Sequence, residues 1–101
     1  MALEEVAQAF AAMGSEARLQ VVLTLVRAGT SGLSIGEIQT RTGMPASTLA
    51  HHLKFLASAG LIEQEKRGRS VMNRPCFARL ETLAGYILNQ CCADAPGECG
   101  D

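Results

Sequence analysis

The sequence contains no apolar run close to the roughly 18 residues that a membrane-spanning helix requires. Its first ten residues carry acidic side chains where a signal peptide carries basic ones. Paired carboxylates, a nucleophile with its base and a phosphate-binding loop, the usual groups of enzymes, are not evident either. These absences predict a cytoplasmic protein with no membrane role and no enzymatic activity.

An excess of positive charge is also missing. Nine Lys and Arg residues face ten Asp and Glu residues, and the formal net charge of -1, taken alone, argues against nucleic-acid binding. The charges are unevenly spread, because residues 41–80 hold seven basic and two acidic side chains. That segment therefore carries +5 and the rest of the chain -6. Such asymmetry is expected of a protein with a phosphate-binding surface.

Cysteine is absent from the first 75 residues, and three of the four cysteines fall within the last eleven. A disulfide framework distributes its cysteines along the chain, and a reducing cytosol disfavours disulfides. The cluster of Cys91, Cys92 and Cys99 therefore indicates a site added to a finished fold. Cys76 lies far from the cluster in sequence, and we expect its thiol to be packed rather than to bind a ligand.

A length of 101 residues corresponds to one domain, and an apolar fraction of 48% is sufficient for a buried core. Apolar residues at spacings of three and four predict a first helix that ends at Gly14, with the stripe Leu3, Val6, Phe10 and Met13. Ser15 is the expected N-cap of a second helix, whose predicted core residues are Leu19, Val22, Leu23 and Val26.

Two further helices with a short turn between them follow in the sequence. Ser34 and Glu37 have the spacing of a capping box, which predicts a short helix to Thr42 with a break at Gly43. A longer helix after Pro45 ends near residues 59–60, and it turns inward Leu49, Leu53 and Leu56. A short helix, a glycine-containing turn and a longer helix are the pattern of a helix-turn-helix unit.

The period then changes to that of strands. Residues 61–66 and 71–77 flank the segment Arg67-Gly68-Arg69-Ser70, which predicts a β-hairpin with a tight turn. Pro75 weakens the second strand and suits the edge of a sheet. A hairpin directly after a helix-turn-helix unit predicts the winged form of that unit.

A last helix is expected to run to about Cys91 or Cys92, with the apolar side Leu80, Leu83, Ala84, Ile87 and Leu88. The sequence thus predicts a mainly α (α+β) fold, a winged helix-turn-helix with a two-stranded β-hairpin wing. We divide it into a DNA-binding and dimerisation domain over residues 1–92 and a flexible cysteine-containing tail over residues 93–101. The apolar stripes of the two terminal helices favour dimerisation through them, with core packing inside one chain as the alternative.

The longer helix sorts its residues by an advance of about 100° per residue. The side opposite Leu49 carries Ser47, His51, Lys54 and Ser58, which suit the base edges and phosphates of a major groove. His52 lies nearer the core side and is equally compatible with packing or with DNA contact. Arg67 and Arg69 flank the turn glycine of the hairpin, within reach of phosphates or a minor groove. An ordinary solvated surface is the alternative interpretation for both the helix face and the hairpin tip.

The run from Ser47 to Ile62, STLAHHLKFLASAGLI, together with the segments GSEARL at residues 14–19 and IGEI at residues 35–38, closely resembles the ArsR/SmtB family of bacterial metal- and metalloid-responsive repressors. The resemblance implies a homodimeric winged-helix repressor, dimerised through its first and last helices. Such a protein binds double-stranded operator DNA and releases it when an inducer binds. The predicted DNA contacts are Ser47, Thr48, His51, His52, Lys54, Arg67 and Arg69.

Two inducer sites of that family are missing, because the short helix has no cysteine and both histidines lie in the longer helix. The remaining thiols, Cys91, Cys92 and Cys99, resemble the cysteines of arsenite-responsive members. Three thiolates suit As(III) or a related thiophilic metalloid as inducer, and we expect these residues to bind it. Adjacent helical cysteines point about 100° apart, so at least the end of the helix must unwind or adjust for both to face one ion.

Other functions remain open for the cysteine cluster. Zinc, cadmium or lead fits if Asp94, Glu98 or a water supplies a fourth ligand, and a redox signal acting on the thiols is a further alternative. The cluster is alternatively only a reactive surface, and the winged helix is alternatively used only for protein contacts.

Overall fold

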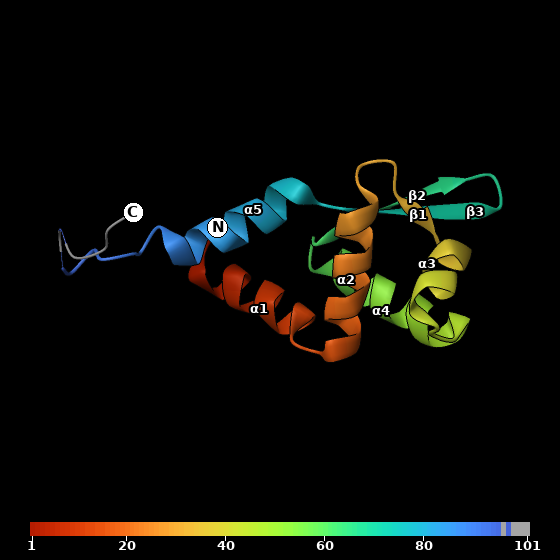
Figure 1. The fold of residues 1–101 in the computed structure, drawn as a ribbon, viewed down its shortest axis with the longest axis horizontal. Helices are drawn as coiled ribbons and strands as arrows, with labels where there is room; N and C mark the ends of the chain where they lie inside the picture. The colour runs from red at the N-terminus through yellow and green to blue at the C-terminus, as the bar shows by residue number, and fades with distance from the viewer. Residues whose placement is uncertain (96, 98–101) are drawn as a thin grey trace.

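The computed structural model describes residues 1–95 and residue 97. Five helices and three strands follow one another in the described chain: α1 (Leu3–Met13), α2 (Glu16–Ala28), β1 (Leu33–Ser34), α3 (Ile35–Thr42), α4 (Ala46–Ser58), β2 (Ile62–Arg67), β3 (Ser70–Pro75) and α5 (Phe77–Leu88) (Figure 1). The strands form one antiparallel sheet. The predicted mainly α fold, a winged helix-turn-helix with a β-hairpin, is confirmed.

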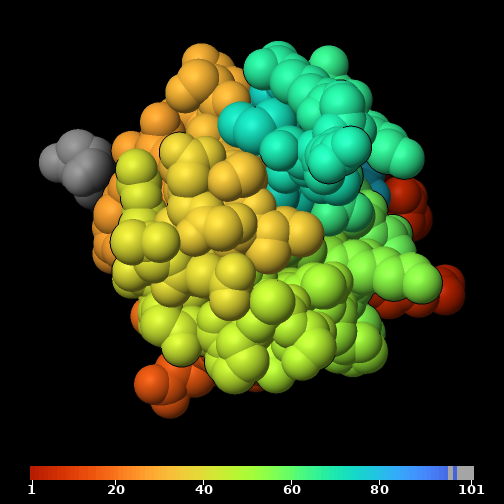
Figure 2. All heavy atoms as spheres, turned by 90° about the vertical axis from the view of Figure 1, so that its right-hand side faces the viewer, coloured from red at the N-terminus to blue at the C-terminus, as the bar shows by residue number. Residues whose placement is uncertain are grey.

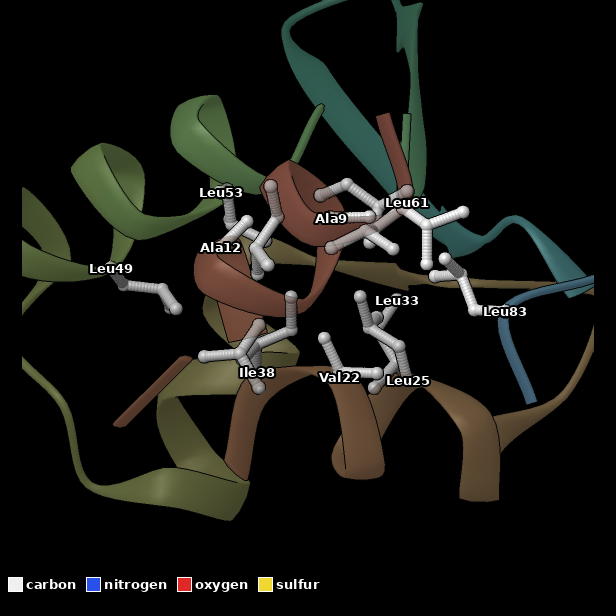
Figure 3. Packing of buried hydrophobic residues seen from close by; sticks show 14 residues of the cluster. Ala9, Ala12, Val22, Leu25, Leu33, Ile38, Leu49, Leu53, Leu61 and Leu83 are labelled. Carbon is white, nitrogen blue, oxygen red and sulfur yellow. The ribbon is translucent and has the colours of Figure 1, made fainter. Parts of the chain in front are cut away.

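The core lies between α1, α2, α3, α4 and the first residues after α4 (Figure 3). The inward leucines of α4 are fully buried, as predicted, and pack with Leu25 of α2 and Ile38 of α3. Burying each such side chain contributes about 1.5 to 3 kcal/mol. Leu61 and Ile62 extend this core to the base of the hairpin, so the helix-turn-helix and the hairpin share one packed interior.

Local capping fixes the ends of the helix-turn-helix. The backbone N–H of Glu37 donates to Ser34 Oγ at 3.2 Å, and the backbone N–H of Ser34 donates to Glu37 Oε1 at 2.9 Å. The predicted capping box is therefore confirmed. Gly43 ends α3 with a φ of 75°, a left-handed conformation that glycine adopts without a steric penalty. The chain thereby turns sharply into α4.

The predicted core stripe of α2 is wrong in three of its four members. Leu19, Leu23 and Val26 are exposed, and the helix instead buries Val21, Val22, Thr24 and Leu25. Thr24 is a polar member of the buried face, and its hydroxyl donates to the backbone carbonyl of Gln20 at 2.8 Å inside the same helix. A threonine whose hydroxyl is bonded in this way can be buried, so the buried face of α2 need not coincide with its most apolar stripe.

The sheet has the strand order β1-β3-β2, so the second strand of the hairpin is central. The expectation that Pro75 suits an edge is wrong for the strand as a whole. Proline is nevertheless tolerated there, because β1 pairs only with Asn73 and Met72 and does not extend opposite Pro75. The two-residue strand β1 is too short to have a sequence pattern, and the prediction missed it.

We call the pair α1 and α5 the arm, because these helices run together away from α3 and the hairpin (Figure 1). Glu5 of α1 and Arg79 of α5 form an ion pair across it at 3.8 Å. The helix α5 ends at Leu88, so the prediction that it reaches Cys91 or Cys92 is wrong. Backbone turns follow, with Cys91 N–H donating to the carbonyl of Leu88 at 2.9 Å.

Among the described residues, no single helix combines the length and the apolar character needed to cross a membrane. The helices α1 and α2 meet that requirement only when they are counted together across a bend of 95° between them.

Candidate nucleic-acid interface

The outer face of α4 is the surface formed by Ser47, Thr48, His51 and Lys54. All four side chains are exposed, while the leucines on the opposite side of the helix are fully buried. A shallow hollow of about 310 Å³ lies on this face, lined by His51, Lys54, Phe55 and Ser58. Hydroxyl, imidazole and ammonium groups on an accessible helix are able to hydrogen-bond base edges and phosphate oxygens.

The helices α3 and α4 and the hairpin meet at one end of the molecule (Figure 2). We call the hairpin β2–β3 the wing. Its strands pair continuously from Ile62 and Pro75 at the base to Arg67 and Ser70 at the tip. Gly68 occupies the tip with a φ of 61°, which the tight turn requires. The turn thus comprises Gly68 and Arg69 alone, and it presents the predicted wing arginines beside the helix-turn-helix.

The two wing arginines have different surroundings. An Arg67 Nη lies 3.2 Å from Glu65 Oε1, and the guanidinium of Arg74 donates to that same oxygen. The hydrogen bond from Arg74, followed by the charge of Arg67, lowers the pKa of the Glu65 carboxyl below its ordinary value. Arg69 has no ion pair within the described chain, and it lines a hollow of about 370 Å³ next to the start of α3. Arg69 is therefore the more available of the two for a phosphate.

His52 is the least accessible of the seven predicted contacts. Its side chain is half-buried, and its Nδ1 is enclosed without a hydrogen-bond partner among the described residues. Its ring centroid lies 6.2 Å from that of His51, which is exposed on the outer face of α4. The structure thus separates two adjacent histidines, with His51 directed to solvent and His52 toward the protein.

Sequence reasoning missed a contact that supports α4. Phe55 keeps 46% of its surface exposed, and the guanidinium carbon of Arg18 lies 4.7 Å from the centroid of its ring. The Nε of Arg18 also donates to the backbone carbonyl of Ala12 at the end of α1. A cation on an exposed aromatic ring contributes about 0.5 to 1 kcal/mol. Arg18 thereby joins the end of α1 and the start of α2 to Phe55 of α4. The sequence signal for the exposure of Phe55 was its position on the helix, about 120° from the buried Leu49.

The cysteine pair follows α5 at the far end of the arm from the wing (Figure 1). The sulfurs of Cys91 and Cys92 lie 3.4 Å apart, and Cys92 has a φ of 58°. This non-helical backbone removes the 100° divergence expected of adjacent helical cysteines. Among residues 1–95 and 97, however, no three His, Cys, Asp or Glu side chains gather closely enough to hold a metal ion. The third predicted thiol, Cys99, lies outside the described residues.

The fourth cysteine, Cys76, is half-buried with a free thiol and lies at the junction of the wing and α5. Its backbone N–H donates to the carbonyl of Leu61 at 2.9 Å. It is therefore at the opposite end of α5 from the cysteine pair.

A helix-turn-helix on a helical core with a β-hairpin beside it defines the winged-helix class of DNA-binding folds. The sequence profile of the helix-turn-helix domain family matches residues 13–65. The ArsR-like transcriptional regulator from Rhodococcus sp. RHA1 has a similar structure, with a TM-score of 0.73 and 31% identity over 85% of this chain and 78% of that one. The chain belongs to the ArsR/SmtB family of winged-helix transcriptional regulators.

Two further comparisons give its relation to other members. It is similar to the homodimeric winged helix-turn-helix DNA-binding domain of Mb0332 from Mycobacterium bovis, with a TM-score of 0.67 and 29% identity over 88% of this chain and 82% of that one. It is 36% identical over 64 residues to YceK of Bacillus subtilis, an uncharacterized HTH-type transcriptional regulator. That match spans 63% of each chain, which is less than two thirds of the relative's length.

Proposed function

We propose that this protein is a transcriptional repressor that binds operator DNA as a homodimer and is released by As(III) or a related thiophilic metalloid. The observation that carries the proposal is the exposed polar face of α4 beside an arginine-bearing wing. The helix α4 supplies donors and acceptors for base edges in a major groove, and Arg67 and Arg69 supply phosphate contacts at the flank.

Dimerisation through the arm supports operator binding, because a two-fold axis presents two copies of α4 to two half-sites. The arm leaves large apolar side chains uncovered, with Leu3 69%, Ile87 59% and Leu88 69% exposed. Exposed apolar surface of this kind is a feature of interfaces. The similar Mycobacterium bovis domain is homodimeric, which favours a second copy of this chain as the partner.

The cysteine pair at the end of the arm supports metalloid binding. Soft thiolate ligands suit As(III), and Cys91 and Cys92 present two sulfurs 3.4 Å apart, with Cys99 as the third ligand in our proposal. The pair follows α5 directly, so an ion held there acts on a helix of the proposed dimer interface. Release requires that the inducer prefer the dimer that does not bind DNA, and couplings of this kind are about 1 to 3 kcal/mol.

The test is the fluorescence anisotropy of a labelled duplex carrying the protein's own promoter region. A DNA reader binds it with an affinity that falls linearly on a logarithmic scale as salt rises. The bound complex is then titrated separately with As(III), Sb(III), Zn(II), Cd(II), Pb(II) and peroxide. Release by As(III) or Sb(III) alone supports the proposal, with Cys76→Ser as a matched control that retains release.

A divalent-metal or redox signal acting on the same fold is the second candidate. The proximity of Cys91 and Cys92 favours it too, since neighbouring sulfurs bind Zn(II), Cd(II) and Pb(II) and are also sites of oxidation. Release by one of these metals or by peroxide, with no response to As(III), would replace the metalloid proposal with this one.

A further inference from the structure

The central strand of the sheet carries a carboxamide with no exposed surface. Asn73 lies in β3, and its register partners are Leu33 in β1 and Gln64 in β2. Its Nδ2 donates to the backbone carbonyl of Leu33 at 3.1 Å and to that of Val71 at 3.3 Å. Its Oδ1 accepts from Gln64 Nε2 at 2.8 Å. One side chain therefore binds to all three strands.

A buried amide is not needed to stabilise a sheet of this size. Burying a carboxamide is unfavourable unless its partners are present, whereas an apolar side chain of similar volume is often neutral or stabilising at such a position. The hydrogen bonds of Asn73 instead specify one arrangement of the strands, because they form only when β1, β2 and β3 stand in this register.

Asn73 lies where the wing meets β1, the strand that leads into the helix-turn-helix. The strand β1 pairs with β3 at only two positions, Leu33 with Asn73 and Ser34 with Met72, whereas β2 and β3 pair at six. Ser34 is also the N-cap of α3, so β1 continues directly into the first helix of the unit. The orientation of the wing relative to α3 and α4 is therefore set by this short ladder, which includes Asn73, together with the packing of α2 and α3 on β3 and of α4 on β2.

The wing tip lies at some distance from Asn73 along the strand. Arg69 lies four residues from Asn73, which at about 3.3 Å per residue corresponds to about 13 Å along the strand. A rotation of β3 at Asn73 would move Arg69 relative to the first residues of α3, with which it lines one hollow. The wing can contact a phosphate while α4 contacts bases only if this rotation is restricted.

We propose that Asn73 is a positioning residue for DNA binding, which holds the wing at the angle that lets Arg69 reach a phosphate while α4 occupies the groove. It has no exposed surface and does not contact the DNA itself. This inference rests on the proposed DNA-binding function.

The test compares Asn73→Leu, Arg69→Ala and the double variant with the wild type, by anisotropy on the promoter duplex over a range of salt. One lost phosphate contact lowers the salt slope by about 0.9, so a dimer that loses one contact per wing loses about 1.8. At about 0.15 M salt this corresponds to about 30-fold weaker binding. We expect this change from Asn73→Leu, and no further change when Arg69→Ala is added to it.

The matched control is Thr24→Val, because Thr24 is the other buried polar residue of the described core and lies on α2, outside the sheet. This variant should keep the wild-type salt slope. If Asn73 had only a structural role, Asn73→Leu would leave that slope unchanged as well. If Asn73→Leu fails to fold, Gln64→Leu removes the bond to β2 and should shift the slope in the same direction by a smaller amount.

A wild-type slope in folded Asn73→Leu, or in Gln64→Leu where that variant replaces it, would overturn the inference. So would an undiminished effect of Arg69→Ala in the Asn73→Leu background. A wild-type protein that binds no duplex contradicts the proposed function itself, whereas a binding wild type with an unaffected Asn73→Leu variant contradicts only the role of Asn73.

Discussion

Ile87 offers the most quantitative test of the proposed dimer. It lies in the last turn of α5 and keeps 59% of its surface exposed. Full burial of such a side chain contributes about 1.5 to 3 kcal/mol, so covering its exposed part contributes about 1 to 2 kcal/mol. A two-fold interface covers both copies, which makes about 2 to 4 kcal/mol per dimer. The variant Ile87→Ala should therefore raise the dimer dissociation constant about 30- to 700-fold.

Sedimentation velocity over a range of protein concentrations measures this constant directly. The control is Phe55→Ala, since Phe55 is also large, apolar and 46% exposed but lies on α4 outside the arm. It should leave dimerisation unchanged. A dissociation constant within threefold of the wild-type value for Ile87→Ala, or an equal effect of both variants, would refute the assignment of the arm as the interface.

Three further groups of substitutions test the cysteine site, the wing and the start of α3. Replacing Cys91, Cys92 or Cys99 singly with Ser should retain operator binding and abolish release by As(III), as measured by anisotropy, and full release from Cys92→Ser would rule out a three-thiolate site. Glu65→Gln should strengthen DNA binding and steepen its salt dependence by up to about 0.9 per wing, because it frees Arg67 from an ion pair, and an unchanged slope would argue against a phosphate contact by Arg67. Glu37→Gln should lower the melting temperature at pH 7 and reduce its pH dependence. The backbone hydrogen bond from Ser34 lowers the pKa of Glu37 below its ordinary value. The stabilisation is therefore present above the ordinary pKa of a glutamate and is lost as pH falls through the lowered pKa. A melting temperature that changes equally with pH in the wild type and in Glu37→Gln would contradict this.

The helix-turn-helix was predictable because its signals are local and strong. The leucines of α4 repeat at one helical face, and both the capping box at Ser34 and the left-handed glycine at residue 43 mark ends of α3. The same periodicity argument failed for α2, where the most apolar stripe is not the buried one. Burial of Thr24 depends on a hydrogen bond within the helix, which a count of apolar residues does not register.

The features that sequence reasoning missed are tertiary or short. The strand β1 has two residues, and it becomes a strand only because β3 is beside it. Arg18 and Phe55 are far apart in the sequence, so their contact depends on how α2 packs on α4. The candidate DNA contacts on α4 were predictable as an exposed face, whereas the pairing of Arg67 with Glu65 followed only from the strand geometry.

The role of α4 in DNA recognition is tested by comparing the operator affinity of Lys54→Ala with that of Arg27→Ala. Each variant removes one exposed positive charge, but Lys54 lies on the outer face of α4 and Arg27 on α2. We predict that Lys54→Ala weakens binding and reduces the salt slope by about 0.9 per protomer, while Arg27→Ala leaves the slope at the wild-type value. Equal effects of the two variants would contradict it, because they would show that only the total charge matters.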